Sequence, residues 1–161
     1  METTEGEQRA VEALEASGIP HVVMRHGPVS SLAEAAAVRG IDPSQVVKTI
    51  VVRRGDDDFL FVLVPGDRTI SWPRLRELLG VNRLSMPDAA TARDVTGYER
   101  GTITPFGSLH PWPVIADARV HGLVSIGAGA HGVSATLEGS ELVRVLGATV
   151  ADVTDPAPTD R

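Results

Sequence analysis

Cysteine is absent from the 161 residues of the sequence. This excludes disulfide bonds, thiolate nucleophiles and cysteine-ligated zinc sites. Apolar runs long enough to span a membrane are also lacking, and the acidic N-terminus does not resemble a secretory signal peptide. We therefore expect a cytoplasmic protein without a membrane partner.

Positive charge is scarce as well. Lys and Arg together number 15 against 21 Asp and Glu, which gives a net charge of −6. Dedicated nucleic-acid binders usually carry a basic surface, so this balance argues against a DNA partner. Brief contact with RNA through a local group of arginines is still compatible with it, although such residues more often form a solvated surface. Five arginines fall close together in the sequence and could form such a group: Arg74, Arg76, Arg83, Arg93 and Arg100.

Lysine is far rarer than arginine: Lys48 is the only lysine in the sequence, beside fourteen arginines. It stands within residues 45–52, an apolar and β-branched run typical of a buried strand. Arginine cannot replace lysine where a compact ammonium, or an amine with an adjustable pKa, must reach one point of a pocket. We therefore predict a functional Lys48; the alternative is a strand-end lysine that extends to solvent.

Hydrophobic periodicity predicts interleaved helices and strands in one domain of the α/β class. The expected sheet is mixed and mostly antiparallel, with helices packed around it, and a hairpin turn falls at residues 53–58. From Thr154 onward the chain is expected to be a flexible tail. Helices are predicted at 5–17, from a cap at Ser30 or Ser31 to Gly40, at 72–79 after Ser71, at 89–95 and at 140–146. Strands are predicted at 20–25, 45–52, 59–64, 114–116, 123–126, 133–137 and 148–153.

Two irregular, glycine-rich segments could supply a site. Residues 96–107 contain three glycines and a proline, so their main-chain groups could approach a ligand closely, although an ordinary connecting loop is equally compatible. Residues 127–132 look like a phosphate-binding turn but match no dinucleotide fingerprint. His131 in that turn could be a general base or donor, or an ordinary surface histidine. Asp117 could bind a ligand or act as a structural cap. The histidines lack the spacing of a zinc site, so we expect neither a metal nor another cofactor.

These segments resemble the YbaK/EbsC family, whose fold is shared with the editing domain of bacterial prolyl-tRNA synthetases. The resemblance extends over nearly the whole chain. It rests on the strand Gln45-Val46-Val47-Lys48-Thr49, the loop Gly101-Thr102-Ile103-Thr104-Pro105, the strand end Ile115-Ala116-Asp117 and the turn Gly127-Ala128-Gly129-Ala130-His131-Gly132. It implies one domain over residues 1–153, with residues 154–161 as the tail.

The resemblance implies a trans-editing hydrolase that deacylates mischarged aminoacyl-tRNA. The substrate would be tRNA(Pro) carrying Cys, Ala or another small amino acid, bound transiently by its 3′ end, and prolyl-tRNA synthetase is a second expected partner. Lys48 and Gly101 would be catalytic, with the Lys48 side chain pointing toward residues 101–105. The implied substrate-binding residues are Thr102, Ile103, Thr104, Pro105, Gly127, Gly129, His131 and Ser134.

Departures from the family pattern affect the expected amino-acid specificity. Gly127 and Ser134 stand where cysteine-clearing members tend to have a serine and an acid, and Met24 and Ser31 stand where aromatic residues are common. Two other functions are compatible with the same residues. One is a non-catalytic module that binds a nucleotide or an aminoacyl group, and the other is an accessory protein that docks on a synthetase.

Overall fold

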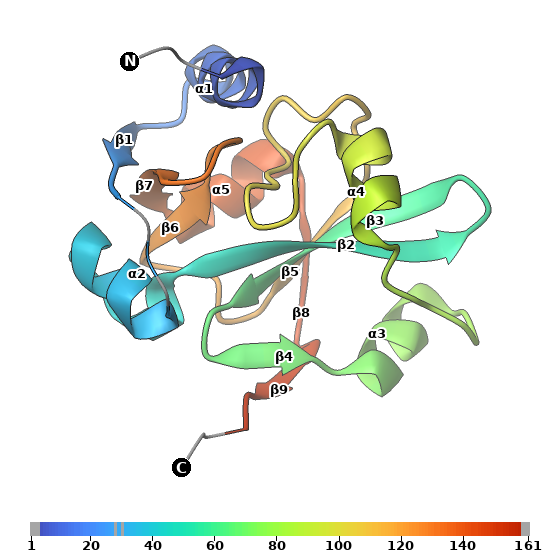
Figure 1. The fold of residues 1–161 in the computed structure, drawn as a ribbon. Helices are drawn as coiled ribbons and strands as arrows, with labels where there is room; N and C mark the ends of the chain where they lie inside the picture. The colour runs from blue at the N-terminus through green and yellow to red at the C-terminus, as the bar shows by residue number, and fades with distance from the viewer. Residues whose placement is uncertain (1–3, 28, 30, 159–161) are drawn as a thin grey trace.

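The computed structural model of the protein describes residues 4–27, 29 and 31–158. Figure 1 shows helices packed around crossing strands, and no helix within the described residues is long and apolar enough to cross a membrane. The helices are α1 (Glu5–Ser17), α2 (Leu32–Arg39), the short 3-10 helix η1 (Pro43–Gln45), α3 (Trp72–Leu79), α4 (Ala89–Thr96) and α5 (Gly139–Leu146). The strands are β1 (His21–Arg25), β2 (Val47–Gly55), β3 (Asp58–Pro65), β4 (Arg68–Ile70), β5 (Val114–Asp117), β6 (Leu123–Gly127), β7 (Val133–Glu138), β8 (Thr149–Ala151) and β9 (Thr154–Pro156).

The strands form three sheets. The largest has the order β2-β3-β5-β8, in which β2 and β3 are antiparallel and the other two pairings are parallel. The order β1-β7-β6 gives a second, antiparallel sheet, and β4 pairs antiparallel with β9. The predicted α/β class with a mixed, mostly antiparallel pairing is confirmed, although the strands are distributed over three sheets instead of one.

Strand β3 lies at the centre of the fold, and both of its faces are buried. Alternate side chains enter two apolar clusters, one shared with α1, α5 and the β1-β7-β6 sheet, and one shared with α3 and β4. In Figure 1, α1 and α3 accordingly lie on opposite sides of β2 and β3. A strand buried on both faces reads as a continuous apolar run, as residues 59–64 do. The first set is Phe59, Phe61 and Leu63, and the second is Leu60, Val62 and Val64.

Local capping signals in the sequence predicted most helix ends correctly. Ser31 and Ser71 cap α2 and α3 by accepting hydrogen bonds from backbone N–H groups three residues later. Gly40 and Gly80 end the same helices in the left-handed conformation that favours glycine. Ser30, the alternative cap for α2, lies outside the described residues.

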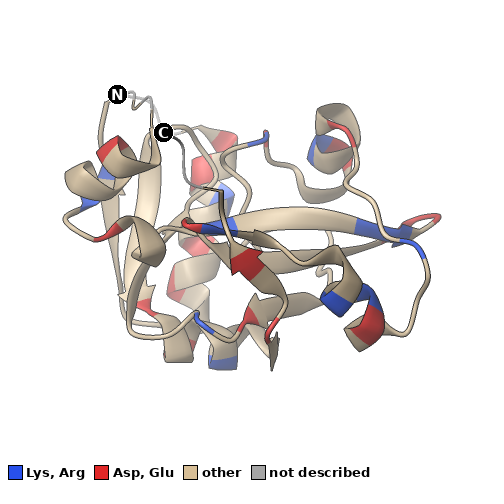
Figure 2. Ribbon diagram, turned by 90° about the horizontal axis from the view of Figure 1, so that it is seen from below, with Lys and Arg blue, Asp and Glu red and all other residues tan. Residues whose placement is uncertain are grey.

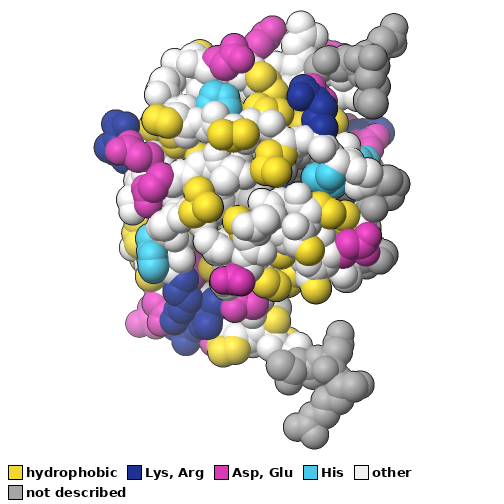
Figure 3. Space-filling model, turned by 90° about the vertical axis from the view of Figure 1, so that its left-hand side faces the viewer, with side chains coloured by type: hydrophobic (Ala, Val, Ile, Leu, Met, Phe, Trp, Pro, Cys, Tyr) yellow, Lys and Arg dark blue, Asp and Glu magenta, His cyan; other side chains and the backbone are white. Residues whose placement is uncertain are grey.

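Charged residues are distributed over many elements. Figure 2 shows basic and acidic positions interleaved along the ribbon, and Figure 3 shows small groups of apolar side chains among polar ones on the side of β1 and α2. Arg74, one of the arginines considered for RNA contact, is paired with Asp155 at 2.8 Å and with Asp152 at 3.6 Å. Part of the predicted arginine group is therefore neutralised within the protein.

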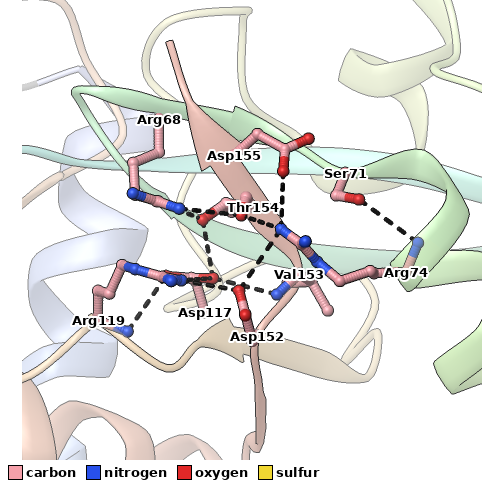
Figure 4. A network of polar contacts seen from close by, with 9 residues as sticks. All are labelled: Arg68, Ser71, Arg74, Asp117, Arg119, Asp152, Val153, Thr154 and Asp155. Atoms are coloured by element: carbon pink, nitrogen blue, oxygen red, sulfur yellow. Dashed lines mark hydrogen bonds and ion pairs between the residues drawn. The ribbon is translucent and has the colours of Figure 1, made fainter.

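The C-terminal segment differs from the prediction of a flexible tail. Residues Thr154–Pro156 form β9 against β4, and Thr154 is fully buried. The Thr154 hydroxyl donates to Asp117 Oδ1 at 2.9 Å, and the backbone N–H of Val153 donates to the same oxygen at 3.2 Å (Figure 4). The domain therefore continues beyond residue 153, while residues 159–161 lie outside the described residues.

Asp117 holds this end of the chain from the buried terminus of β5. Its carboxylate also accepts from the backbone N–H and the guanidinium of Arg119, and Arg119 in turn contacts Asp152 at 2.9 Å (Figure 4). Every one of these partners belongs to the protein itself. Of the two roles considered for Asp117, the structural one is supported.

We expect Asp117→Ala to lower the free energy of unfolding by about 1–3 kcal/mol for each buried donor left without an acceptor. The donors concerned are the Thr154 hydroxyl and the Val153 N–H, and chemical denaturation measures the change. Asp152→Ala is the matched control, because its carboxylate is half-exposed and such ion pairs contribute about 0–1 kcal/mol. Equal losses in the two variants would contradict the role assigned to Asp117.

Candidate functional site

Over the middle of its length, strand β2 is paired with a neighbouring strand on one side only. At its start Val46 forms a bridge with Ser125 of β6. Farther along, Arg53 exchanges two backbone hydrogen bonds with Ser85, at 2.7 and 3.1 Å. Between these two points, no described strand pairs with the outer edge of β2. Unpaired main-chain donors and acceptors on an edge strand are available to a ligand.

The backbone direction of individual β2 residues follows from this arrangement. In an antiparallel pair, successive residues point their N–H and C=O groups to opposite sides of the strand. Arg53 points these groups outward to Ser85, so Val47, Thr49 and Val51 also point theirs outward. The pairing of Val47 with Pro65 agrees, because proline has no N–H to offer.

A pocket of about 400 Å³ lies against this edge. Its walls are residues 46–51, Gly127 at the end of β6, the loop residues Gly101 and Ile103, and parts of α4 and of the segment before it. Three segments that are far apart in the sequence therefore meet here. Lys48, Gly101, Ile103 and Gly127 are the predicted site residues that line it.

Lys48 lines the pocket as predicted, but its ammonium is not directed toward residues 101–105. The Nζ atom donates to the carbonyl oxygen of Arg68 at 3.2 Å. The reason is its position in β2, where its side chain shares a face with Val52 and hence with the α3 side of the sheet. Partial burial of Lys48 lowers its pKa from the ordinary value, although the residue stays exposed in part, and the nearby Asp67 opposes this shift. One hydrogen bond leaves two ammonium donors for a ligand.

Thr49 is a pocket residue that the sequence analysis did not single out. Its side chain lies on the same face of β2 as Val47 and Val51, which pack in the cluster that contains Ile103. The Oγ1 atom is buried and has no hydrogen-bond partner in the part of the chain that the structure describes. Buried hydroxyls are normally paired, so this one is available to a ligand.

The loop that carries Gly101 is held by hydrogen bonds within the protein. The Thr102 hydroxyl donates to the Glu99 carbonyl at 2.7 Å, and the Thr102 carbonyl accepts from Gly129 N at 3.0 Å. Gly101 has a φ of +90°, a left-handed conformation that favours glycine. In the described residues the N–H groups of Gly101 and Ile103 have no recorded partner. The loop thus offers two main-chain donors beside the pocket.

Helix α1 supports the same loop from outside. Arg9 donates to the carbonyls of Gly97 at 2.7 Å and Gly107 at 3.2 Å, and its guanidinium lies 4.8 Å from the centre of the Tyr98 ring. Tyr98 is buried, and its hydroxyl donates to the Phe106 carbonyl at 2.6 Å. Both ends of the loop are therefore fixed before any ligand binds.

His131 lies in a second, smaller hollow of about 340 Å³ beside the first. This hollow is lined by Thr102, Gly129 and His131, and the His131 ring is 3.4 Å from a Glu99 carboxylate oxygen. A Cβ built on Gly101 would lie 3.7 Å from the His131 ring, so the two hollows adjoin at Gly101. Gly129 has a structural reason to be glycine, because a Cβ there would lie 2.3 Å from the Gly6 carbonyl oxygen of α1.

Thr104, Pro105 and Ser134 line neither hollow. Thr104 is buried, and its hydroxyl accepts from Phe106 N at 3.3 Å. Ser134 is fully buried in β7 opposite Met24 of β1. Direct contact of Thr104 and Ser134 with a substrate is therefore not supported by their positions.

Other lining residues were not predicted as site residues. Arg39 at the end of α2 and Met86 before α4 both reach the main pocket. No cluster of three or more His, Asp or Glu side chains suited to a metal ion occurs in residues 4–27, 29 and 31–158. The chemistry that this pocket can offer consists of cations, main-chain N–H groups and one threonine hydroxyl.

Comparison with protein families gives a match to the aminoacyl-tRNA editing domain over residues 26–145. The chain belongs to this family. The matched residues include β2, the Gly101 loop and the turn after β6, so they contain the whole main pocket. The YbaK-like resemblance in the sequence is thereby confirmed.

Several curated relatives of the chain are proline–tRNA ligases. The chain is 28% identical to the ligase of Bacillus licheniformis over 130 residues, which are 81% of this chain and 21% of that enzyme. It is 35% identical to the ligase of Desulforamulus reducens over 98 residues, which are 61% of this chain and 17% of that enzyme. The chain thus spans about a fifth of the length of these curated relatives.

Solved structures confirm the fold. A hypothetical protein superimposes with a TM-score of 0.83 at 27% identity, covering 91% of this chain and 99% of its own. A protein proposed to be a trans-editing enzyme for prolyl tRNA synthetase superimposes with a TM-score of 0.85 at 24% identity, covering 96% and 99%. This editing domain therefore has the architecture expected from the resemblance.

The buried Tyr98 gives a direct measure of how well the editing-domain loop is fixed. Burial raises the pKa of its phenol from 10.0 to about 12, although the neighbouring Arg9 opposes the shift. Because Tyr98 is the only tyrosine, tyrosinate absorbance during an alkaline titration reports on it alone. We expect ionisation near pH 12 in the folded protein and near pH 10 in denaturant.

The stability effect has a definite sign. A phenol with a raised pKa in the folded state stabilises the fold fully below pH 10, and this contribution is lost as the pH rises through about 12. Ionisation near pH 10 while circular dichroism still reports a folded protein would contradict the closed loop described above.

Proposed function

We propose that this protein is a hydrolase that deacylates mischarged aminoacyl-tRNA in trans. The observation that carries the proposal is the pocket in which Lys48, Gly101 and Gly127 meet, within a domain of the aminoacyl-tRNA editing family. The 3′-terminal aminoacyl-adenosine of the tRNA would enter this pocket and place its ester beside the Gly101 loop.

The proposed mechanism relies on positioning and electrostatics. Among the described lining residues none carries a thiol, imidazole or carboxylate, and Thr49 is the one hydroxyl. Water, or a hydroxyl of the substrate itself, would therefore attack the ester. The N–H groups of Gly101 and Ile103 would donate to the oxyanion that develops on the carbonyl oxygen. Because hydrogen bonds already fix the loop, little reorganisation is needed during the reaction.

The proposed substrate is tRNA(Pro) carrying Cys, Ala or another small amino acid, with prolyl-tRNA synthetase as a further partner. The similarity to proline–tRNA ligases supports this choice of tRNA. Gly127 bears on the amino acid, because a Cβ there would lie only 3.5–3.6 Å from the backbone of Thr102 and Ile103. These are ordinary van der Waals distances, so a serine would fit at this position, and its side chain would occupy space that the glycine leaves open.

A panel of tRNAs charged with different amino acids tests the proposal. Each is incubated with the protein, and loss of the ester is compared with the rate in buffer. Deacylation of at least one mischarged tRNA well above that rate is expected, with correctly charged prolyl-tRNA(Pro) spared. If none is cleaved faster than in buffer, the hydrolase proposal fails.

A non-catalytic binding module is the second candidate. The lack of an acid, a base or a thiol among the described lining residues favours it. Aminoacyl-adenosine, a minimal substrate, distinguishes the two functions. Turnover supports the hydrolase, whereas saturable binding without cleavage supports the module.

Lys48→Ala is expected to lower deacylation by about a hundredfold or more. This corresponds to roughly 2.7 kcal/mol, because each 1.36 kcal/mol changes a rate tenfold. The expected cause is loss of the two ammonium donors that the Arg68 contact leaves for the ligand. Lys48→Arg is expected to fail as well, because a planar guanidinium is wider than an ammonium and cannot occupy the same point beside the Arg68 carbonyl. Initial rates of ester loss from the best tRNA of the panel measure both variants.

Arg83→Ala is the control for these variants, since Arg83 is exposed and lies outside the pocket. It should retain the wild-type rate, and all three variants should show wild-type circular dichroism. A folded Lys48→Arg protein with full activity would rule out the proposed role of the ammonium.

A further inference from the structure

The main pocket has an unbalanced set of charges. Its lining includes three cationic residues, Arg39, Lys48 and Arg100, and no acidic residue among those the structure describes. This contrasts with the whole chain, in which acidic residues outnumber basic ones. A local excess of positive charge attracts an anionic ligand.

Two of these cations have an acidic neighbour close to the pocket. Asp67 interacts with Lys48 and acts to raise its pKa. Arg100 interacts with Asp88, whose pKa is lowered mainly by the backbone N–H of Thr91 and to a smaller extent by Arg100. Both Lys48 and Arg100 are also exposed, so water solvates their charges.

Arg39 has neither form of compensation. It forms no ion pair with any described residue, and burial alone lowers its pKa. Its recorded hydrogen bond runs from Nη1 to the Ser125 hydroxyl at 3.1 Å, while Nε is buried without a partner. Ser125 is fully buried in β6, so the contact fixes the guanidinium at the pocket wall. A partly buried cation without a counter-charge is costly for the ligand-free protein.

We propose that Arg39 is a binding residue that recognises an anionic oxygen group of the ligand in this pocket. The planar guanidinium fork matches phosphate and carboxylate oxygens, and its N–H groups beyond the Ser125 contact are without a described partner. This inference deepens the proposed function and rests on it, because the ligand is taken to be the aminoacylated 3′ end of a tRNA.

Two parts of such a ligand carry the required chemistry. One is the phosphate on the 5′ side of the terminal adenosine, and the other is the side-chain carboxylate of an acidic aminoacyl group. Lys48 and Arg100 are exposed and Arg39 is partly buried, so Arg39 is the cation of the three that water compensates least. An anion paired with it therefore gains more than one paired with an exposed cation.

Binding of three uncleavable probes tests the assignment without requiring turnover. The reference probe is 3′-deoxy-3′-(alanylamino)adenosine, which has an α-amino group but no anionic group. The second probe adds a 5′-phosphate, and the third replaces alanyl by aspartyl. Dissociation constants are measured by calorimetry for the wild type, Arg39→Met and Arg39→Lys, with Arg83→Met as the matched control for loss of one positive charge. Circular dichroism establishes that each variant is folded.

We expect one of the two probes with an anionic group to bind the wild type roughly ten- to a hundredfold more tightly than the reference probe, as expected for charge-assisted hydrogen bonds. Arg39→Met should abolish this preference and leave the affinity for the reference probe unchanged, and Arg83→Met should keep both the preference and that affinity. A preference for the phosphorylated probe identifies the phosphate as the source, and a preference for the aspartyl probe identifies the carboxylate.

The proposal is overturned if the wild type prefers neither probe with an anionic group over the reference probe, or if Arg39→Met keeps the preference. Should Arg39→Met not fold, Arg39→Lys decides, because an ammonium keeps the charge but loses the fork and must show a weaker preference than the wild type. Failure of the hydrolase proposal is distinguishable, since the probes would then bind as described while no aminoacyl-tRNA is cleaved.

Discussion

The site depends on how the two larger sheets separate after one β-bridge between them. Val46 of the β2 segment and Ser125 of β6 form a bridge, and beyond it β2 continues along β3 while β6 pairs with β7. The outer edge of β2 is left unpaired until Arg53 meets Ser85. The pocket occupies this gap, so the backbone of β2 forms one of its walls.

The opposite wall is rigid because the protein itself satisfies most of its polar groups. Arg9, Tyr98 and Thr102 bind carbonyls at both ends and in the middle of the loop, and Gly129 ties it to the turn after β6. Within the described residues, the N–H groups of Gly101 and Ile103 in this loop have no partner, and neither does the hydroxyl of Thr49 on the β2 wall. A domain without an evident nucleophile can still assist hydrolysis if such donors are held in place.

Local features of the sequence predicted the elements well. The caps at Ser31 and Ser71 and the continuous apolar run of β3 depend on residues that are adjacent in sequence, so they can be recognised without the fold. The β9 strand could not be predicted in this way. Thr154 is ordered by a carboxylate 37 residues earlier, and nothing near Thr154 in the sequence indicates that partner.

The site was predictable in part for the same reason. Family resemblance identified Lys48, Gly101 and Gly127, and the structure brings all three to one pocket. Thr49 and Arg39 were missed because their role depends on which edge of β2 is free and on where α2 ends relative to β6. The predicted direction of the Lys48 side chain was wrong. Strand alternation places this side chain toward Arg68, and the register of β2 with β3 sets that alternation.

The central claim is that an aminoacylated 3′ end binds between the free edge of β2 and the Gly101 loop. Backbone amide NMR shifts, recorded while 3′-deoxy-3′-(alanylamino)adenosine is added, test it most directly. The account predicts that the largest shifts fall on Thr49, Gly101, Ile103 and Gly127, with smaller ones at His131 in the neighbouring hollow. Largest shifts at His131 and Gly129, with those of Thr49 and Ile103 unchanged, would contradict it.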